Sequence, residues 1–286
     1  MNRRGLLIGF AGVALPQVFC KRPRDETQAA SAPLAPVVPP GERGYRLVRN
    51  WDFATEIRDI PTLSKEFYTR YIYNDGTLDH LADEWSRYRD NNNHVFTAEG
   101  LSLIARATGP LAPGAVESGM LRSRWSGQYG IFEICMRAPR GRGLLPAFWL
   151  NAEDQVWPPE IDVVEIVNNE SDTTRRSFHY LHGADTANSV RRMSKLSKSQ
   201  SYDPGFDYAD DFHVFGVEWT AEAVRHFVDG VTVCDQTFRW VHNDGRDGGR
   251  AHILVNLSVG GHWPGPPDDR TLPASLSVRH VRVWQR

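Results

Sequence analysis

The chain has 286 residues, of which 41% are hydrophobic and 11% aromatic, and its formal net charge at pH 7 is −2. This composition is typical of a globular protein that buries a sizeable core. The near-neutral charge lacks the basic footprint that nucleic-acid binding needs, so we expect no nucleic-acid partner. Single domains of about 200–250 residues are common among all-β sandwiches, so the length alone does not require two domains.

The first twenty residues have the pattern of an export signal. Arg3 and Arg4 precede an apolar run at 6–19, and this order is typical of signal peptides, here resembling the twin-arginine type. The run is shorter than the roughly 20 apolar residues of a membrane span, so we expect no stable span. We predict that residues 1–20 direct the protein to the periplasm or the medium. The alternative is an N-terminal anchor, with Cys20 as a lipid attachment point.

Residues 21–40 are rich in alanine and proline and predict an extended linker. Residues 41–286 have the composition of one folded domain. Strand-like runs lie at 129–136, 213–219, 223–228, 231–233, 251–259 and 275–284. Asp229-Gly230 is a hairpin signal between two of them, and one or two helical turns are expected at 78–88. Many short strands predict an all-β sandwich of two antiparallel sheets, in which a curved sheet offers a concave cleft.

Two cysteines, Cys135 and Cys234, lie in strand-like runs of the predicted domain. In an exported protein they could form a disulfide, and buried free thiols are the alternative. The cysteine spacing does not match that of a metal site.

The sequence EIDVVE at 160–165 places three carboxylates within six residues. Side chains alternate between the faces of a strand, so Glu160 and Asp162 share one face while Glu165 falls on the other. An edge strand with its acids in water explains the first two acids but not the third. A β-bulge at Val163-Val164 adds one residue and returns all three acids to one face, and bulges are common beside active sites.

The bulge would also set the distance between the two glutamates. With one residue absorbed, Glu160 and Glu165 lie four strand positions apart, roughly 13 Å along the backbone. Side chains that lean inward bring the carboxyl groups about 5–6 Å apart, the separation of a retaining glycosidase. Ionising all three clustered carboxylates is unfavourable because like charges repel. One of them should therefore keep its proton near neutral pH, as a general acid must. The spacing therefore predicts glycoside hydrolysis, with the water-exposed edge strand as the alternative.

Three tryptophans are candidate sugar contacts. Trp149 and Trp157 precede the acidic strand, and Trp263 follows a Gly-Gly turn. Aromatic faces suit the apolar faces of sugar rings, and the indole N–H can donate a hydrogen bond. Core packing is the alternative in a sandwich with nine tryptophans.

Other polar residues fall on strands or in a basic segment. His179 and His182 have opposite parity on one strand, so they are not expected to share a metal ion. In the run 252–259 the polar residues alternate with apolar ones, and Asn256 is the first candidate for the cleft. The segment 191–200 carries four cationic side chains, which predicts a solvated loop or, as an alternative, a subsite for an anionic glycan.

The acidic motif resembles that of glycoside hydrolase family 16, whose members carry E-[ILV]-D-x-x-E on a bulged strand. Further segments resemble the family in the same order, at 129–133, 139–150, 212–219, 227–230, 256–265 and 281–285. The resemblance spans residues 117–286 and implies a β-jelly-roll with a concave substrate cleft. The two-residue spacer between Asp162 and Glu165 is similar to that of laminarinases, agarases and carrageenases.

The resemblance also implies roles for individual residues. Glu160 would be the nucleophile, Glu165 the general acid/base, and Asp162 the residue that assists Glu160. The implied activity is retaining endo-hydrolysis of internal β-glycosidic bonds, with a β-1,3- or mixed β-1,3/1,4-glucan as first substrate. The family has a histidine-containing strand beside the cleft, so His179 or His182 is implied to contact the substrate.

Several alternatives remain open at this stage. The glycan could be agar, carrageenan or an anionic bacterial exopolysaccharide, and the same intermediate would support transglycosylation. A non-catalytic glycan-binding protein is disfavoured because both glutamates are present. We expect a monomer that needs no cofactor and has a polysaccharide as its partner. The family further suggests a structural calcium ion away from the cleft, with Asp52 as one candidate ligand.

Overall fold

The structure, a computed structural model, describes residues 39–90, 92–170, 173–184 and 195–286. The predicted export signal, most of the predicted linker and the beginning of the basic segment 191–200 lie outside the described residues. What the sequence predicts for those segments therefore stays a prediction.

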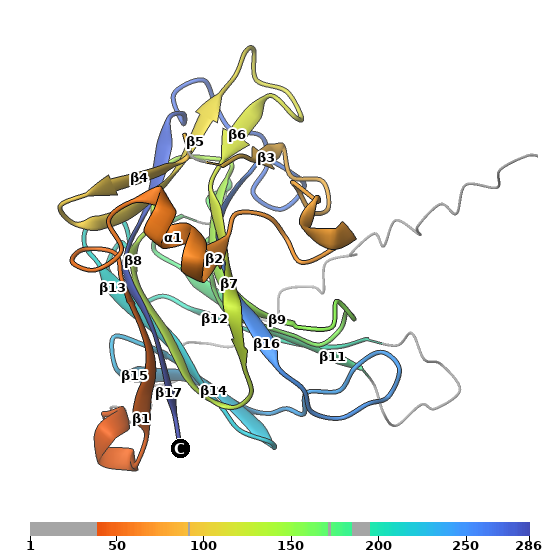
Figure 1. The fold of residues 1–286 in the computed structure, drawn as a ribbon. Helices are drawn as coiled ribbons and strands as arrows, with labels where there is room; N and C mark the ends of the chain where they lie inside the picture. Colours follow the sequence, from red (N-terminus) through yellow and green to blue (C-terminus); the bar gives the residue numbers. More distant parts are fainter. Residues whose placement is uncertain (1–38, 91, 171–172, 185–194) are drawn as a thin grey trace, which may run out of the picture. The chain divides into compact units, whose positions relative to one another are not determined.

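Two β-sheets pack face to face in the described part of the chain (Figure 1). Sheet 1 has the strand order β15-β14-β13-β8-β17-β5-β6-β3, with β1 beside β17 and β4 beside β5. Sheet 2 has the order β12-β11-β10-β9-β16-β7-β2. All strand pairs are antiparallel except β3 with β6. This confirms the predicted all-β sandwich of two antiparallel sheets.

The bounds of the strands follow from their pairing. The strands of sheet 1 are β1 (Arg46–Asp52), β3 (Ser86–Tyr88), β4 (His94–Thr97), β5 (Gly100–Ala107), β6 (Val116–Ser118), β8 (Gly130–Arg137), β13 (His213–Trp219), β14 (Ala223–Val228), β15 (Val231–Thr237) and β17 (Ala274–Gln285). Those of sheet 2 are β2 (Phe67–Tyr68), β7 (Met120–Gly127), β9 (Leu144–Ala152), β10 (Glu160–Glu165), β11 (Ser177–Ala184), β12 (Lys195–Tyr202) and β16 (Ala251–Val259). Every strand-like run singled out in the sequence is a strand here.

The observed turns and helices agree with the predictions from sequence only in part. The predicted hairpin joins β14 to β15, and Asp229 and Gly230 both have the positive φ, 48° and 74°, that a type I′ turn requires. The helical turns predicted at 78–88 are wrong, because this segment runs irregularly into β3. The helix α1 (Ile60–Glu66) lies elsewhere, and the Asp59 carboxylate caps it by accepting a hydrogen bond from Thr62 N at 2.7 Å. Two short 3-10 turns, η1 (Pro40–Arg43) and η2 (Asn74–Gly76), complete the described elements.

The main core fills the space between the sheets. Phe132 and Trp219 from sheet 1 meet Phe148 and Ile161 from sheet 2, and all four are fully buried. Each such side chain stabilises the fold by about 1.5–3 kcal/mol relative to exposure. The other face of sheet 2 is thereby free for polar side chains, and the site described below lies on it.

A second apolar cluster covers part of that outer face of sheet 2. Tyr71 and Tyr88, which flank the irregular segment 71–88, pack against Trp149, Leu254 and Met120 of the sheet. The segment therefore covers one part of the face and leaves the rest open to solvent. This division decides which polar residues of sheet 2 can meet a ligand.

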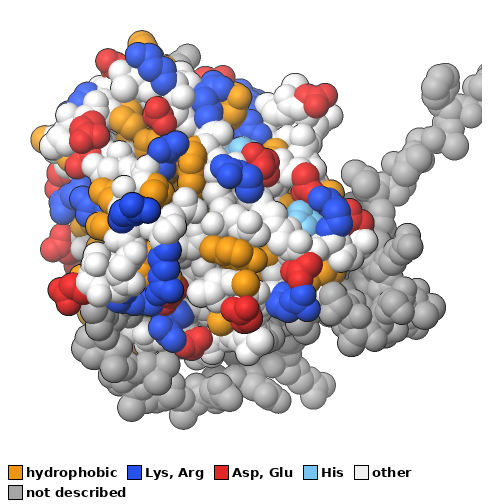
Figure 2. All heavy atoms as spheres, turned by 60° about the horizontal axis from the view of Figure 1, so that its bottom comes forward, with side chains coloured by type: hydrophobic (Ala, Val, Ile, Leu, Met, Phe, Trp, Pro, Cys, Tyr) orange, Lys and Arg blue, Asp and Glu red, His pale blue; other side chains and the backbone are white. Residues whose placement is uncertain are grey.

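The described residues also show the state of the cysteines, the length of the helices and the distribution of surface charge. Cys135 and Cys234 are buried and form no disulfide, so the free-thiol alternative holds. None of the described helices is long and apolar enough to cross a membrane. Basic and acidic side chains are interspersed over the face that Figure 2 shows, in line with the near-zero net charge.

Candidate active site

The acidic strand β10 contains the predicted bulge. Along β9, Asp162 pairs with Trp149 and Glu165 with Ala147, so the four residues 162–165 of β10 oppose three residues of β9. Val163 is the extra residue, and the register against β11 shifts at the same place. The bulge returns Glu165 to the face of Asp162. Because β10 lies between β9 and β11, the edge-strand alternative is wrong.

Two buried histidines satisfy the backbone at the bulge. His226 of β14, in the opposite sheet, donates from Nε2 to the Asp162 carbonyl at 3.1 Å. His179 of β11 donates from Nδ1 to the Val163 carbonyl at 2.6 Å. Burial lowers the pKa of His179 to about 4 and that of His226 well below 6.5, so both rings are neutral at pH 7. The bulge thus has its own donors, which hold its carbonyls in place.

The carboxylate of Glu160 is held through one of its two oxygens. Asn151 Nδ2 and Trp157 Nε1 donate to Glu160 Oε2 at 3.1 and 3.0 Å. Tyr73 in turn donates its hydroxyl to Asn151 Oδ1 at 3.1 Å, which fixes the orientation of that amide. These contacts leave Oε1 as the oxygen available for reaction.

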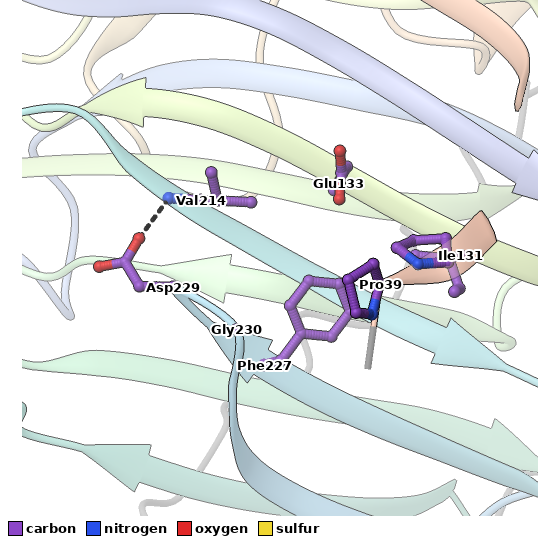
Figure 3. A pocket seen from close by; sticks show the side chains of 8 residues that line it. Pro39, Ile131, Glu133, Val214, Phe227, Asp229 and Gly230 are labelled. Atoms are coloured by element: carbon purple, nitrogen blue, oxygen red, sulfur yellow. Dashed lines mark hydrogen bonds between the residues drawn. The ribbon is translucent and has the colours of Figure 1, made fainter. Parts of the chain in front are cut away.

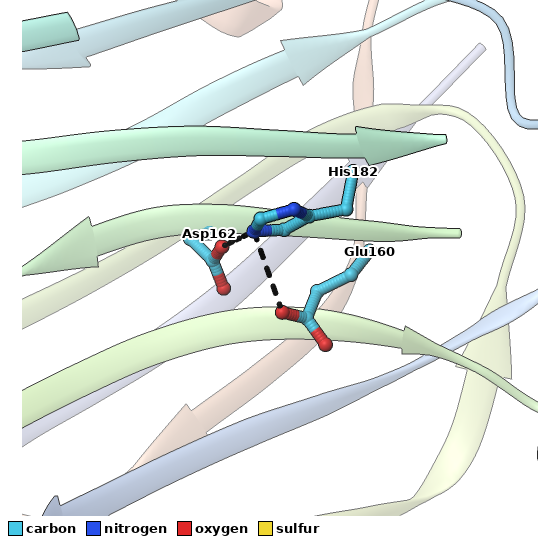
Figure 4. Close-up of side chains that lie close together, drawn as sticks. All are labelled: Glu160, Asp162 and His182. Atoms are coloured by element: carbon cyan, nitrogen blue, oxygen red, sulfur yellow. Dashed lines mark ion pairs between the residues drawn. The ribbon is translucent and has the colours of Figure 1, made fainter. Parts of the chain in front are cut away.

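His182 lies beside the two acids at the beginning of β10 (Figure 4). Its Nε2 is 3.2 Å from Asp162 Oδ2 and 3.9 Å from Glu160 Oε1. One donor atom from each of these three residues lies within 4.8 Å of the others, close enough for a single metal ion. These donors also lie within ion-pairing distance of one another.

The two glutamates have different electrostatic environments. Burial raises the pKa of Glu160 to about 8, and Asp162 acts in the same direction, whereas His182 and the two N–H donors act against it. Burial also raises the pKa of Glu165 well above 4.5, and the charges of Asp162 and Glu160 add to this effect. In the described part of the chain Glu165 has no hydrogen bond or ion pair that would favour its charged form. Burial thus raises the pKa of both glutamates, and only Glu160 has N–H donors in the described residues that favour its charged form.

Two of the three predicted tryptophans, Trp157 and Trp263, lie in the exposed part of the site. Trp157 contacts Glu160 directly and packs against His182, with ring centroids 5.8 Å apart. Trp263 is half-buried and packs edge-on against Phe178, the residue that pairs with Glu165 across β10 and β11. Both line the exposed part of the site, and their contact with a glycan stays a prediction.

Trp149 and Asn256 lie under the covering segment 71–88. Trp149 is 7% exposed and donates from Nε1 to Asn256 Oδ1 at 2.8 Å, and Asn256 Nδ2 donates to the Tyr88 hydroxyl at 3.0 Å. Their polar groups are thus satisfied within the protein. The geometry points to a supporting role for both, and direct substrate contact stays a prediction.

The two histidines of β11 point to opposite faces of sheet 2, as their positions on the strand predict. His182 faces the acids, as described above. His179 points between the sheets, where it is 1% exposed and packs against His226 at 5.0 Å between ring centroids. A glycan on the outer face would not reach it. The structure therefore corrects the expectation that His179 contacts the substrate: its partner is the bulge.

Three residues that shape the site were not predicted from the sequence. Asn151 and Tyr73 position Glu160, as described above. Glu84 is 8% exposed and accepts hydrogen bonds from Tyr88 OH at 2.8 Å and Ser258 Oγ at 2.7 Å, which ties the covering segment to sheet 2. The register between β9 and β10 could have pointed to Asn151, since it pairs with Glu160. The other two lie in an irregular segment whose path the sequence pattern does not predict.

Neither the pocket in Figure 3 nor Asp52 belongs to this site. The pocket, of about 430 Å³, lies against sheet 1 and is lined by Ile131, Glu133, Val214 and Phe227 among others. Asp52 ends β1 and accepts hydrogen bonds at Oδ1 from the backbone N–H groups of the next turn, at 2.8 and 2.9 Å. Calcium binding there stays a prediction.

Comparison with known protein families bears directly on this arrangement. The family described as "Glycosyl hydrolases family 16" matches residues 82–271, which include the bulged strand and all three acids. The chain belongs to this family. The resemblance seen in the motifs is thereby confirmed, and retention of anomeric configuration is a general property of the family.

Individual members are similar to this chain over part of their length. A beta-glucanase of Rhodothermus marinus is 31% identical over 186 residues, which cover 57% of this chain and 60% of the relative. An endo-1,3-1,4-beta-glycanase of Rhizobium meliloti is 30% identical over 170 residues, covering 58% of this chain and 33% of the relative. The chain thus spans between a third and three fifths of the length of these two relatives.

The fold comparison covers more of the chain. The solved structure of an endo-beta-1,3-glucanase from Pyrococcus furiosus superposes with a TM-score of 0.65 at 26% identity, covering 84% of this chain and 94% of that one. This likeness confirms the family's jelly-roll architecture for the two sheets described above.

Proposed function

We propose that this protein is a retaining endo-β-1,3(4)-glucanase, with Glu160 as nucleophile and Glu165 as general acid/base. The observation that carries the proposal is the bulge at Val163, which brings both glutamates to one face of sheet 2, where two N–H groups donate to Glu160 and burial raises the pKa of Glu165. The names of the three relatives support β-1,3- and mixed β-1,3/1,4-glucans as the substrate class.

In the first step, Oε1 of Glu160 attacks the anomeric carbon, and the bond from that carbon to the leaving oxygen breaks. Glu165 donates its proton to the leaving oxygen, so the first half of the cleaved chain departs as an alcohol. Glu160 suits the nucleophile's role because two N–H donors hold Oε2 and leave Oε1 free. Asp162 and His182 lie next to the same carboxylate and orient it.

In the second step, water attacks the same carbon from the opposite face and Glu160 departs as a carboxylate. Glu165, now ionised, takes the proton of that water and returns to its starting state. The two inversions give net retention, and the reaction needs no cofactor. Transfer to a sugar hydroxyl in place of water would make the same protein a transglycosylase.

Variants of the two glutamates test the assignment. Glu160→Gln should abolish turnover of laminarin while leaving the fold and glycan binding intact; substantial residual activity would remove Glu160 from the nucleophile's role. Glu165→Ala should regain activity on an activated aryl glycoside when azide is added, and the product should be the β-glycosyl azide. An α-azide, or no azide product, would contradict the role of Glu165.

A reducing-end assay on laminarin, mixed-linkage glucan, agarose and carrageenan tests the substrate class. We expect the two glucans to give the fastest release of reducing ends. A clear preference for agarose or carrageenan would replace the glucan by a galactan. We also infer from residues 1–20 that the protein acts in the periplasm or the medium, which cell fractionation of the natural host would check.

A further inference from the structure

The turn 153–159, which joins β9 to β10, carries one of the N–H donors that hold the Glu160 carboxylate. Trp157 Nε1 lies 3.0 Å from Glu160 Oε2, and the indole ring also packs against His182. Residues 153–155 of the turn are exposed. An exposed turn is mobile unless other parts of the protein hold it. The position of Trp157 therefore depends on the contacts between this turn and the rest of the protein.

Asp154 connects the turn to the loop 238–250, which lies between β15 and β16. Arg246 Nη2 donates to Asp154 Oδ2 at 2.5 Å, and His242 Nδ1 lies 3.3 Å from the same oxygen. The other oxygen, Oδ1, accepts a hydrogen bond from the N–H of Val156 at 3.2 Å. The Asp154 carboxylate therefore joins the loop to the residue that comes directly before the tryptophan.

Two backbone hydrogen bonds hold the ends of the turn against the same loop. Glu153 N donates to the Arg250 carbonyl at 3.0 Å, and Asn243 N donates to the Pro158 carbonyl at 3.2 Å. The loop thus follows the turn from one end to the other, and Asp154 supplies a link in between.

The loop 238–250 is itself anchored to the strand that carries His182. Ala184 N, near the end of β11, donates to the Val241 carbonyl at 3.1 Å. The His242 side chain is 3% exposed, and its Nε2 lies 2.9 Å from the Gly248 carbonyl. The loop therefore has a fixed place beside β11, from which it can hold the turn.

We propose that Asp154 is a positioning residue that keeps the Trp157 indole N–H on the Glu160 carboxylate. The proposal rests on the proposed glycanase function, since it concerns the alignment of the nucleophile. The ion pair of Asp154 with Arg246 is partly exposed, so its loss should change the stability of the fold little. Its effect on the nucleophile is larger, because a displaced N–H no longer favours the charged form of the acid.

The pH dependence of kcat/KM on laminarin tests the proposal, because its acid limb reports the ionisation of Glu160. Asp154→Asn keeps the oxygen that accepts from Val156 and removes the charge that attracts Arg246. The acid limb should move to higher pH by about half a unit, because the Trp157 N–H favours the charged form of Glu160 less. Loss of a negative charge acts in the opposite direction, so a purely electrostatic effect would move the limb to lower pH.

Two further variants complete the comparison. Trp157→Phe removes the donor itself, and adding Asp154→Asn to it should cause no further shift, because both act through one contact. Arg239→Gln is the matched control, since it removes an equal charge and an exposed ion pair with Asp247 inside the same loop; it should leave the limb unchanged. The titratable neighbours of Glu160 are the same in all variants: Asp162, Glu165, His182 and Tyr73.

The direction and the additivity of the shifts decide the outcome. A shift to higher pH in Asp154→Asn that disappears in the Trp157→Phe background supports the proposal. An unchanged limb, a shift to lower pH, or a shift that adds fully to that of Trp157→Phe overturns it.

A measurement without turnover separates this proposal from the proposed function. In protein with isotope-labelled tryptophan, the indole N–H signal of Trp157 in an NMR spectrum is the one that Trp157→Phe removes. In the wild type its chemical shift should follow the ionisation of Glu160, and Asp154→Asn should reduce that response to less than about half. No response in the wild type, or an equal response in the two proteins, overturns the positioning role even if laminarin is cleaved. A reduced response in a protein that cleaves no glucan supports the positioning role and contradicts only the proposed substrate.

Discussion

Two glutamates near the outer face of sheet 2, the buried Glu84 and the half-buried Glu165, have different environments. Glu84 accepts hydrogen bonds from four hydroxyl groups, those of Tyr71, Ser86, Tyr88 and Ser258, and holds the covering segment in place. Glu165 has no such partner in the described residues, and burial with two neighbouring acids raises its pKa. The comparison teaches that burial alone does not mark a functional acid. A satisfied glutamate stabilises the fold, whereas an unsatisfied one beside other acids is ready to donate a proton.

The largest effect is expected where the unsatisfied acid is removed. Glu165→Gln should lower kcat on laminarin by about 10²–10⁴-fold, because the variant cannot protonate the leaving oxygen. Its free energy of unfolding should stay equal to that of the wild type or rise, because a buried ionisable group is lost. Steady-state kinetics and urea unfolding check both parts. A large loss of stability would make Glu165 resemble Glu84 and would remove the contrast between them.

The satisfied acid should behave in the opposite way. Glu84→Ala leaves the hydroxyls of Ser86, Tyr88 and Ser258 without their shared acceptor and should lower the free energy of unfolding by about 3 kcal/mol. Glu99→Ala is the matched control, because Glu99 is an exposed partner of Arg137 and should cost less than about 1 kcal/mol. Urea unfolding compares the two variants. Equal losses would show that the network around Glu84 adds no stability.

A smaller effect is expected from the support of the bulge. His226→Leu removes the donor to the Asp162 carbonyl and should lower kcat about tenfold with little change in KM, because the acids shift relative to each other. His280→Leu is a control from sheet 1, since the partly buried His280 lies on β17 away from the bulge. Restoration of kcat in His226→Gln, which can still donate, would support positioning. Unchanged kcat in His226→Leu would contradict it.

The effect that is smallest at each single step is a dependence of stability on pH, which accumulates with every pH unit. The folded-state pKa of Glu165 lies above its unfolded value near 4.5, so its contribution is present below pH 4.5 and is lost as pH rises through the raised pKa. Relative to Glu165→Gln, the wild type should therefore lose up to about 1.4 kcal/mol per pH unit above pH 4.5. Urea unfolding of both proteins between pH 5 and 8 measures this difference. Parallel curves would show that Glu165 has an ordinary pKa.

Much of the site could be predicted from sequence because its signals are local. The alternation of side chains along β10 exposed the parity mismatch of Glu165, and a bulge is the local way to correct it. The same period marked the strands, and Asp229-Gly230 marked a turn that only certain backbone angles allow. These features depend on residues within a few positions of one another.

The remaining features depend on contacts between distant parts of the chain. The segment 71–88 covers Trp149, and no local pattern predicts where an irregular segment lies. His226 reaches the bulge from the other sheet, 64 positions along the chain from Asp162. The sequence by itself determined the acids, their spacing and the strands that carry them. Only the tertiary structure decided which side chains are covered and which hold the bulge, because burial and pairing are properties of the packed sheets.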